Sequence, residues 1–431
     1  MGVEVWVWVW LRVWVWVWVW VWVWVWVWVW VLEFILGDLG GATFARAVRD
    51  DDIVDQLHHH VITTSLLVLG MTVAGQQFMG NPINCWIPAQ YDVDDSGYQD
   101  YVDSYCWISH MYNVPFTEEL PLHIEDRLSD DRDVNFYRWV VVMMFFQALL
   151  FWLPRLIWKT CCSFSGLDIE KIINMALEAQ LLSDETRQEK MSNISAAVDR
   201  WLGTFRESQT KPSLRFLQTL KQMVVFDRRS GNYLTRQSLF MKLLYLTNVI
   251  CQFQLLSSFL GTNYWRYGTD VLAALATESS WTDESNFPRV GMCDFEIRQL
   301  QNTQRHTVQC ALPTNLFLEK IYALLWFVMA GLSVLTAVSL VSTAVFTCRR
   351  EQVMNQYANL LDKPLKDKED RGIYKTFVET YLRDDGAFVV RTVGNNTSEI
   401  LALDLLTQLW SKFKDTLPII EEFPTTSVGN Q

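Results

Sequence analysis

Four long apolar stretches, separated by polar segments, constrain this chain more than any other feature. They cover residues 61–80, 136–158, 240–261 and 321–347, and the last contains 27 residues without a charge. A helix of about 20 apolar residues crosses the hydrocarbon core of a bilayer. One such stretch could be a buried helix of a soluble protein. Four of them predict a membrane protein with four transmembrane helices.

A further apolar tract, at residues 5–31, alternates Val and Trp and holds 12 of the 22 Trp of the chain. Both residues are apolar, so the alternation separates no polar face from an apolar one. A simple GTGTGG repeat in DNA encodes this pattern. We therefore interpret residues 1–36 as the translation of a low-complexity DNA repeat that was included in the gene model by error, rather than as a native segment of the protein. The alternative is a real membrane span, which would leave the topology of the later spans unchanged.

Loop charges predict the orientation of the four helices. Segment 159–239 contains 12 Lys and Arg, whereas 81–135 contains 2 and 262–318 contains 4. Lys and Arg are enriched on the cytoplasmic side of membrane proteins. We expect extracellular loops at 81–135 and 262–320, a cytoplasmic loop at 159–239, and cytoplasmic terminal segments at 37–60 and 348–431. Weak amphipathic patterns in the cytoplasmic segments predict helices there. The expected fold is an all-α membrane protein, a four-helix bundle with helical cytoplasmic domains.

Composition and motifs narrow the function. The net charge of −12 argues against nucleic acid as the main partner. There is no Gly-rich phosphate loop, HExxH or Gly-x-Ser-x-Gly, so we expect neither catalytic residues nor a cofactor. Three consecutive His, at 58–60, point in different directions on a helix and do not predict a metal site. A non-enzymatic membrane protein is the expectation.

The eight cysteines divide by predicted compartment. Four of them lie in the predicted extracellular loops and predict two disulfides, with three pairings open: Cys85, Cys106, Cys293 and Cys310. Cys161, Cys162 and Cys348 lie at predicted cytoplasmic membrane edges, where free thiols or lipidation are the alternatives. Pairing between the two loops would join them into one rigid extracellular cap.

Polar residues on the first span form a stripe. Ser65, Thr72 and Gln76 fall within about 40° of one another on a helix. Lipid does not solvate such groups, so the stripe faces either another helix or a water-filled pore. Four helices are too few to enclose a wide pore, so a pore would require an oligomer. A shorter stripe of Asn248 and Gln252 on the third span favours an interhelical hydrogen bond.

A carboxylate cluster precedes the first span, at Asp50, Asp51, Asp52 and Asp55. Carboxylates at a helix start complement the helix dipole, and this role is one interpretation. The other is an acidic ring at the cytoplasmic mouth of a channel.

Several strings of residues resemble the innexins, the gap-junction proteins of invertebrates, over about residues 48–415. They lie in the same order and on the same predicted topology as in that family: DDDIVD (50–55), NPINCW (81–86), YCWI (105–108), FYRWV (136–140), FFQAL (145–149), FPRV (287–290) and VQCALP (308–313). The fourth string usually reads YYQWV in the family. The short pore-entrance segment that begins innexins is displaced here by the Val-Trp tract, so its residues cannot be assigned.

The resemblance implies a subunit of a large-pore channel that joins adjacent cells for passive passage of ions and small molecules. Subunits would form a homo- or hetero-oligomeric ring, expected to be octameric, in the plasma membrane at cell–cell junctions, where it docks with a ring in the apposed membrane. It also implies disulfides between Cys85 and Cys310 and between Cys106 and Cys293. Alternatives are a non-junctional hemichannel that releases small molecules such as ATP and, more remotely, a four-span adhesion or receptor scaffold.

Overall fold

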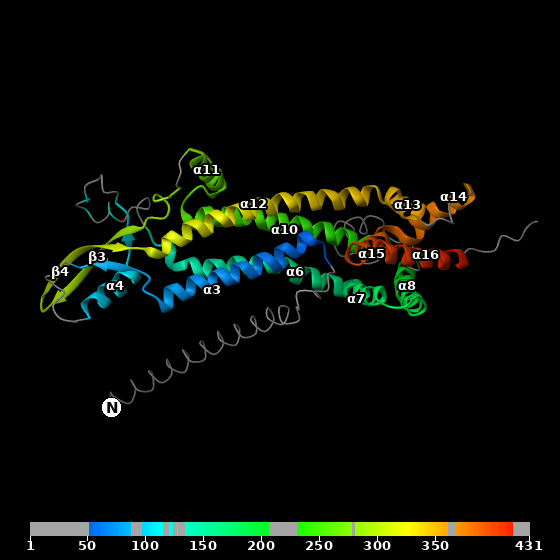
Figure 1. Ribbon diagram of the computed structural model, residues 1–431, viewed down its shortest axis with the longest axis horizontal. Coiled ribbons are helices and arrows are strands. Elements are labelled where there is room, and N and C mark those ends of the chain that lie inside the picture. The colour runs from blue at the N-terminus through cyan, green and yellow to red at the C-terminus, as the bar shows by residue number, and fades with distance from the viewer. Residues whose placement is uncertain are drawn as a thin grey trace, which may run out of the picture.

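A computed structural model describes residues 51–87, 97–114, 120–121, 123, 127, 134–206, 231–277, 281–360 and 368–416. The molecule is elongated, with a bundle of long helices at its centre, a β-sheet at one end and a group of shorter helices at the other (Figure 1). The Val-Trp tract and Asp50 lie outside the described residues. We call the two ends the cap end and the helical-domain end.

Four helical runs in the described residues are long and apolar enough to cross a membrane, in agreement with the four predicted spans. The first is continuous over Ile53–Met79 and comprises α2 (Ile53–Gln56), a π-helical turn η1 (Leu57–Ile62) and α3 (Thr63–Met79). The second comprises a 3₁₀ turn η2 (Phe136–Trp139) and α6 (Val140–Ser165). The third is α10 (Tyr233–Leu260) and the fourth is α12 (Pro313–Cys348).

The helices extend beyond the apolar stretches from which they were predicted. The first begins at Ile53 rather than at residue 61, and α12 begins at Pro313 rather than at 321. A hydropathy window finds only the part of a helix that lies in hydrocarbon, whereas the backbone hydrogen bonds continue until a cap or turn. In α12 the proline occupies the first helical position, where its missing N–H costs nothing.

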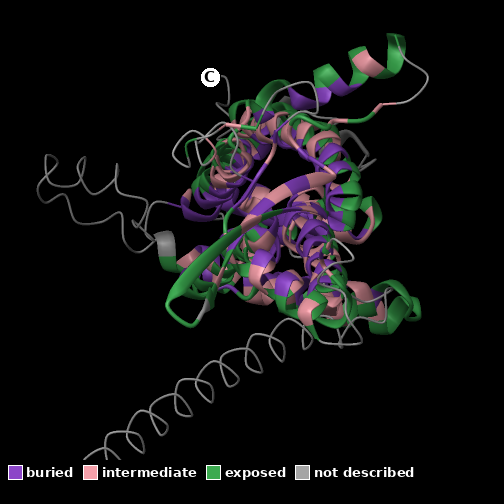
Figure 2. Cartoon of the chain, turned by 90° about the vertical axis from the view of Figure 1, so that its left-hand side faces the viewer, coloured by how far each residue is buried: buried purple, intermediate pink, exposed green. Residues whose placement is uncertain are grey.

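The bundle packs α3 on α6, α6 on α10, and α10 on α12. Its core consists of buried apolar side chains from all four helices, among them Leu66, Phe151, Val249 and Met329. Buried residues gather along the axis of the molecule and exposed residues cover its outside (Figure 2). Many of these outer residues are large and apolar, as expected of helices that contact lipid.

A four-stranded antiparallel sheet, which the sequence did not predict, covers the cap end. Its order is β1 (Asn84–Trp86), β4 (Asn302–Ala311), β3 (Val290–Gln299) and β2 (Met111–Tyr112). Strands β3 and β4 form a long hairpin, and each short outer strand comes from the loop after the first span. The helices α4 (Tyr98–Ile108) and α11 (Tyr264–Thr277) complete this end. The fold class therefore holds, with a sheet added to the expected helices.

Shorter helices form a second hydrophobic core at the helical-domain end. Two precede the third span, α7 (Ile169–Gln180) and α8 (Asp184–Arg206). The others follow the fourth span: α13 (Arg350–Leu360), α14 (Lys368–Thr376), the π-helical turn η4 (Phe377–Leu382), α15 (Arg383–Asn396) and α16 (Glu399–Thr416). Amphipathic α7 buries Ile172, Ile173 and Ala176 in this core. The helices predicted between the second and third spans and those predicted after the fourth span thus pack into one domain.

Candidate functional site

Two disulfides join the two loops that form the cap. Cys85 on β1 is bonded to Cys310 on β4, and Cys106 on α4 is bonded to Cys293 on β3. Each bridge joins the loop after the first span to the loop after the third. This is the pairing that the innexin resemblance implied. All four side chains are buried, so the bridges lie inside the cap rather than on its surface.

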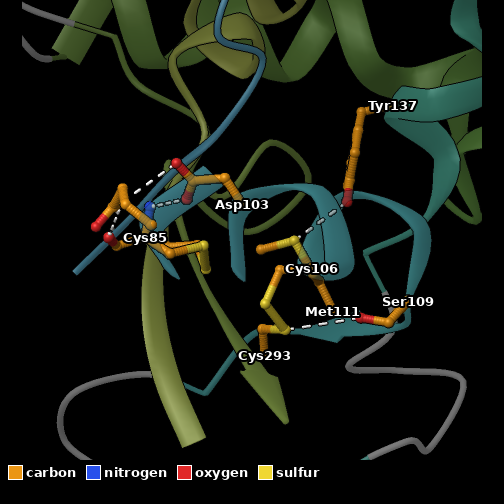
Figure 3. The surroundings of a disulfide bond; sticks show 9 residues. Cys85, Asp103, Cys106, Ser109, Met111, Tyr137 and Cys293 are labelled. Atoms are coloured by element: carbon orange, nitrogen blue, oxygen red, sulfur yellow. Dashed lines mark hydrogen bonds between the residues drawn. A yellow bond between two sulfur atoms is a disulfide. The ribbon is translucent and has the colours of Figure 1, made fainter. Parts of the chain in front are cut away.

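Side-chain hydrogen bonds hold β1 and α4 together around the bridges (Figure 3). The Asp103 carboxylate accepts from the backbone N–H of Cys85 at 2.8 Å, and the Gln99 amide donates to the Cys85 carbonyl at 2.8 Å. The Tyr137 hydroxyl lies 3.1 Å from the Met111 sulfur. Since Tyr137 lies in the first turn of the second span and Met111 lies in β2, this contact connects the cap to the membrane helices.

The sulfur atoms of Cys85, Cys106 and Cys310 lie within 4.8 Å of one another, so the two bridges are adjacent. All three sulfurs are already bonded in disulfides. Cysteine binds a metal as the thiolate, which these bonded sulfurs do not provide. We therefore interpret the group as two adjacent structural disulfides.

The polar stripe on α3 lies on the outside of the subunit. Ser65, Thr72 and Gln76 are all exposed, whereas Leu66 and Val73 on the adjoining face are buried. The Thr72 hydroxyl donates to the Val68 carbonyl at 2.8 Å. The three residues therefore share one face that no other described part of the same subunit covers.

Gln77, the neighbour of Gln76, has a structural role that the sequence analysis missed. It is buried, and its amide donates to the Tyr137 carbonyl at 2.8 Å, which ties α3 to the start of the second span. On the third span Gln252 is also fully buried, but among the described residues neither its amide oxygen nor its nitrogen has a hydrogen-bond partner. The hydrogen bond expected for the Asn248–Gln252 stripe is thus not found for Gln252 within the subunit.

The carboxylates before the first span form ion pairs within the subunit. Asp51 lies 2.5 Å from Arg155 of α6 and 2.9 Å from His59. Asp52 and Asp55 lie 3.0 and 3.2 Å from the ammonium of Lys242 on α10. Asp52 and Asp55 share one ammonium, that of Lys242, and an acidic mouth at these three residues stays a prediction.

Lys242 is the centre of this cluster. Its side chain is only 3% exposed, and its ammonium also donates to the Ser339 hydroxyl of α12 at 2.7 Å. The Ser339 hydroxyl in turn donates to Asp52 at 3.0 Å. Burial alone would raise the pKa of Asp52, but the charge of Lys242 holds it below the usual value of 3.8. The cluster joins the first, second, third and fourth spans at the helical-domain end. Asp52 is the N-cap residue of α2 and Asp55 lies in its first turn, where carboxylates complement the helix dipole, although the Asp52 side chain makes no cap hydrogen bond.

One further buried carboxylate, also missed from sequence, joins the helical domain to the bundle. Asp385 of α15 accepts hydrogen bonds from the backbone N–H and the hydroxyl of Thr235, in the first turn of α10. The Asp385 backbone N–H donates to the Gly231 carbonyl at 3.1 Å. Burial raises the pKa of Asp385 above its usual value. No local sequence signal links these positions, which are 150 residues apart.

The sequence model of the innexin family matches residues 51–413, which include both disulfides, all four spans and most of the helical domain. The chain belongs to the innexin family. Innexin unc-9 of Caenorhabditis elegans is 31% identical over 381 residues, covering 86% of this chain and 96% of that protein. Innexin-11 of the same organism is 31% identical, covering 91% of this chain and 86% of that protein. Innexin-3, also from Caenorhabditis elegans, is 28% identical, with 86% of each chain covered.

Innexins are plasma-membrane channel proteins rather than enzymes, and they assemble as oligomers into gap junctions. This innexin is accordingly a gap-junction channel subunit.

Proposed function

We propose that the cap of this innexin faces the extracellular space and docks against the cap of a second ring in the apposed membrane. The helical domain and both termini would then lie in the cytoplasm. Two observations support this orientation. The segment 159–239, which contributes α7 and α8 to the helical domain, contains 12 Lys and Arg, as cytoplasmic segments do. The cysteines of the cap are joined in disulfides, which persist in oxidising compartments.

The pore would be lined by the exposed face of α3. The observation that carries this proposal is the shared exposure of Ser65, Thr72 and Gln76, which lie on a helix of membrane-spanning length. Polar side chains in a span avoid lipid and face protein or water. A closed ring turns the same face of every subunit inward, so one stripe per subunit is enough to line an aqueous channel. By the family resemblance we expect a ring of eight, of one or several kinds of innexin subunit, surrounded by membrane lipid.

Ions and small molecules would pass through this channel by diffusion. The experiment is a measurement of junctional conductance between paired cells that both express the chain, with pairs in which one cell lacks it as the control. Docked rings predict conductance only when both cells of a pair contribute a compatible ring. Currents in single cells without junctional conductance would instead favour a non-junctional hemichannel that releases small molecules such as ATP.

A further inference from the structure

The helix α11 is fixed to the bundle at the cap end, in contact with both α10 and α12. The chain turns at Gly261, which has a φ of 66°, and α11 begins three residues later. The backbone N–H of Tyr264 donates to the Ser257 hydroxyl of α10 at 2.8 Å, and the Tyr264 hydroxyl donates to the Tyr322 carbonyl of α12 at 2.7 Å. These bonds anchor the start of α11 on two spans at once.

Close packing holds the middle of α11 against α12. A Cβ atom added at Gly268 would lie 2.0 Å from the ring of Trp326, so only glycine allows this approach. Trp265 stacks on Phe253 of α10 with ring centroids 5.0 Å apart. The first half of α11 is therefore part of the bundle rather than a free loop.

The contacts place α11 at the depth of the membrane interface. Lys320 is the last charged residue of α12 before the uncharged run of 27 residues at 321–347. Tyr322 and Trp326, which contact α11, lie about 3 and 9 Å beyond Lys320 along the helix axis. The Lys320 ammonium lies over the ring of Trp281 at 4.2 Å. Tyr, Trp and Lys are typical of the membrane–water boundary, so α11 lies at that boundary rather than above it.

The second half of α11 carries no charge, and after the buried Val271 its residues are exposed or half-buried. Residues 271–277 read VLAALAT, and Leu272 and Leu275 are 54% and 53% exposed. The Thr277 hydroxyl donates to the Ala273 carbonyl at 3.0 Å, so this polar group is satisfied within the helix. Figure 1 shows α11 projecting from the side of the bundle at α12, whereas α3 lies on the other side.

The exposed face of α11 continues an exposed row of a span. The indole N–H of Trp265 lies 3.4 Å from the side-chain oxygen of Gln254. Gln254 is exposed on the same face of α10 as the apolar residues Leu243 and Ile250. This row belongs to a helix of membrane-spanning length. The exposed face of the span therefore continues onto α11 through the contact between Gln254 and Trp265.

We propose that α11 is an interfacial anchor, and that Leu272 and Leu275 are inserted into the phospholipid of the cap-side leaflet. An amphipathic helix in this position buries its apolar face about 5–10 Å into the boundary between headgroups and acyl chains. The choice of lipid over a neighbouring subunit rests on the proposed pore. In a ring with α3 facing the pore, the opposite side of each subunit, where α11 lies, faces the surrounding lipid. The absence of charge on residues 271–277 matches a hydrocarbon environment.

The test is quenching of a fluorescent label by nitroxide lipids. Leu275→Cys would be made in full-length protein in which Cys161, Cys162, Cys251 and Cys348 are replaced by Ser, then labelled with bimane and reconstituted in phosphatidylcholine vesicles. The vesicles would carry the nitroxide at the headgroup, at a shallow acyl position or near the chain end. We expect the strongest quenching from the shallow acyl nitroxide. Leu300→Cys, at the fully exposed hairpin tip, is the matched control and should not be quenched.

Equal fluorescence of the Leu275→Cys label with and without nitroxide lipid would overturn the proposal. Formation of a disulfide-linked dimer by Leu275→Cys under mild oxidation would also overturn it, because α11 would then contact a neighbouring subunit. Thiol modification of Gln76→Cys in the same vesicles tests the pore separately. A reactive Gln76→Cys together with an unquenched Leu275→Cys would contradict the anchor and leave the proposed pore intact.

Discussion

Asp385 caps the third span from a helix that lies 150 residues later in the chain. Its carboxylate accepts from the backbone N–H of Thr235 at 3.0 Å and from the Thr235 hydroxyl at 3.1 Å. Thr235 is the third residue of α10, whose own N-cap residue, Asn232, makes no side-chain cap. The helical domain therefore supplies the cap that the local sequence does not, and any movement of α15 is coupled to the start of a membrane helix.

Asp385→Asn is expected to retain the cap, because the amide oxygen can accept both hydrogen bonds without burying a charge. Asp385→Ala removes the acceptor and should lower the free energy of unfolding by about 0.5–2 kcal/mol. The measurement is thermal unfolding of the purified protein in nanodiscs. Equal losses in the two variants would contradict a capping role.

The stability difference between wild type and Asp385→Asn should depend on pH. Burial raises the pKa of Asp385 above 3.8, so the folded state binds the proton more tightly than the unfolded state. The stability from this group is complete below the unfolded pKa and is lost as pH rises through the folded pKa. The free energy of unfolding of Asp385→Asn should therefore rise relative to that of wild type as pH rises from about 4 toward neutral. A fall in the free energy of unfolding of Asp385→Asn relative to wild type over this range would contradict the raised pKa.

Lys242→Met should destabilise the bundle strongly, because it leaves the carboxylates of Asp52 and Asp55 without their cation. Breaking a buried ion pair costs about 3–5 kcal/mol. The double variant Lys242→Met with Asp55→Asn should recover part of this loss. Lys375→Ala is the control, since this lysine is 56% exposed and its pairs are worth at most about 1 kcal/mol. Similar unfolding temperatures for the Lys242 and Lys375 variants would argue against a buried cluster.

Cys85→Ser should abolish junctional conductance between paired cells while the protein still reaches the cell surface. The Cys85–Cys310 bridge fixes β1 beside β4, and loss of a native disulfide typically costs about 2–5 kcal/mol. Cys251→Ser and Cys348→Ser, which remove exposed free thiols, should leave coupling unchanged. Normal coupling of Cys85→Ser cells would show that docking does not need this bridge.

Gly268→Ala should displace α11 from α12, because the new methyl group meets the ring of Trp326. Such overpacking costs about 1–3 kcal/mol. Gly331→Ala in α12 is the matched control, since nothing lies within 4 Å of its added Cβ and alanine favours helix by about 1 kcal/mol. Unfolding temperatures that rise in both variants would contradict the close contact.

The sequence predicted the four spans because hydropathy is a local property, and it placed the bridged cysteines in the two loops that they join. It did not predict the sheet, since β1 and β2 have only three and two residues and pair with strands about 200 positions away. For the carboxylates before the first span it left a helix-dipole role and a pore mouth open, and it did not predict their ion pairs. Lys242 and Arg155, which form those pairs, lie on other helices, and only the packed bundle brings the charges together.

The most direct test of the pore compares two adjacent glutamines on α3, of which Gln76 is exposed and Gln77 is buried against Tyr137. Each would be replaced by Cys in protein without the four free cysteines, and channel conductance would be recorded during addition of a water-soluble methanethiosulfonate reagent. A pore lined by α3 predicts a change of conductance in Gln76→Cys and none in Gln77→Cys. Complete protection of Gln76→Cys in open channels would contradict it and place the stripe at a protein interface.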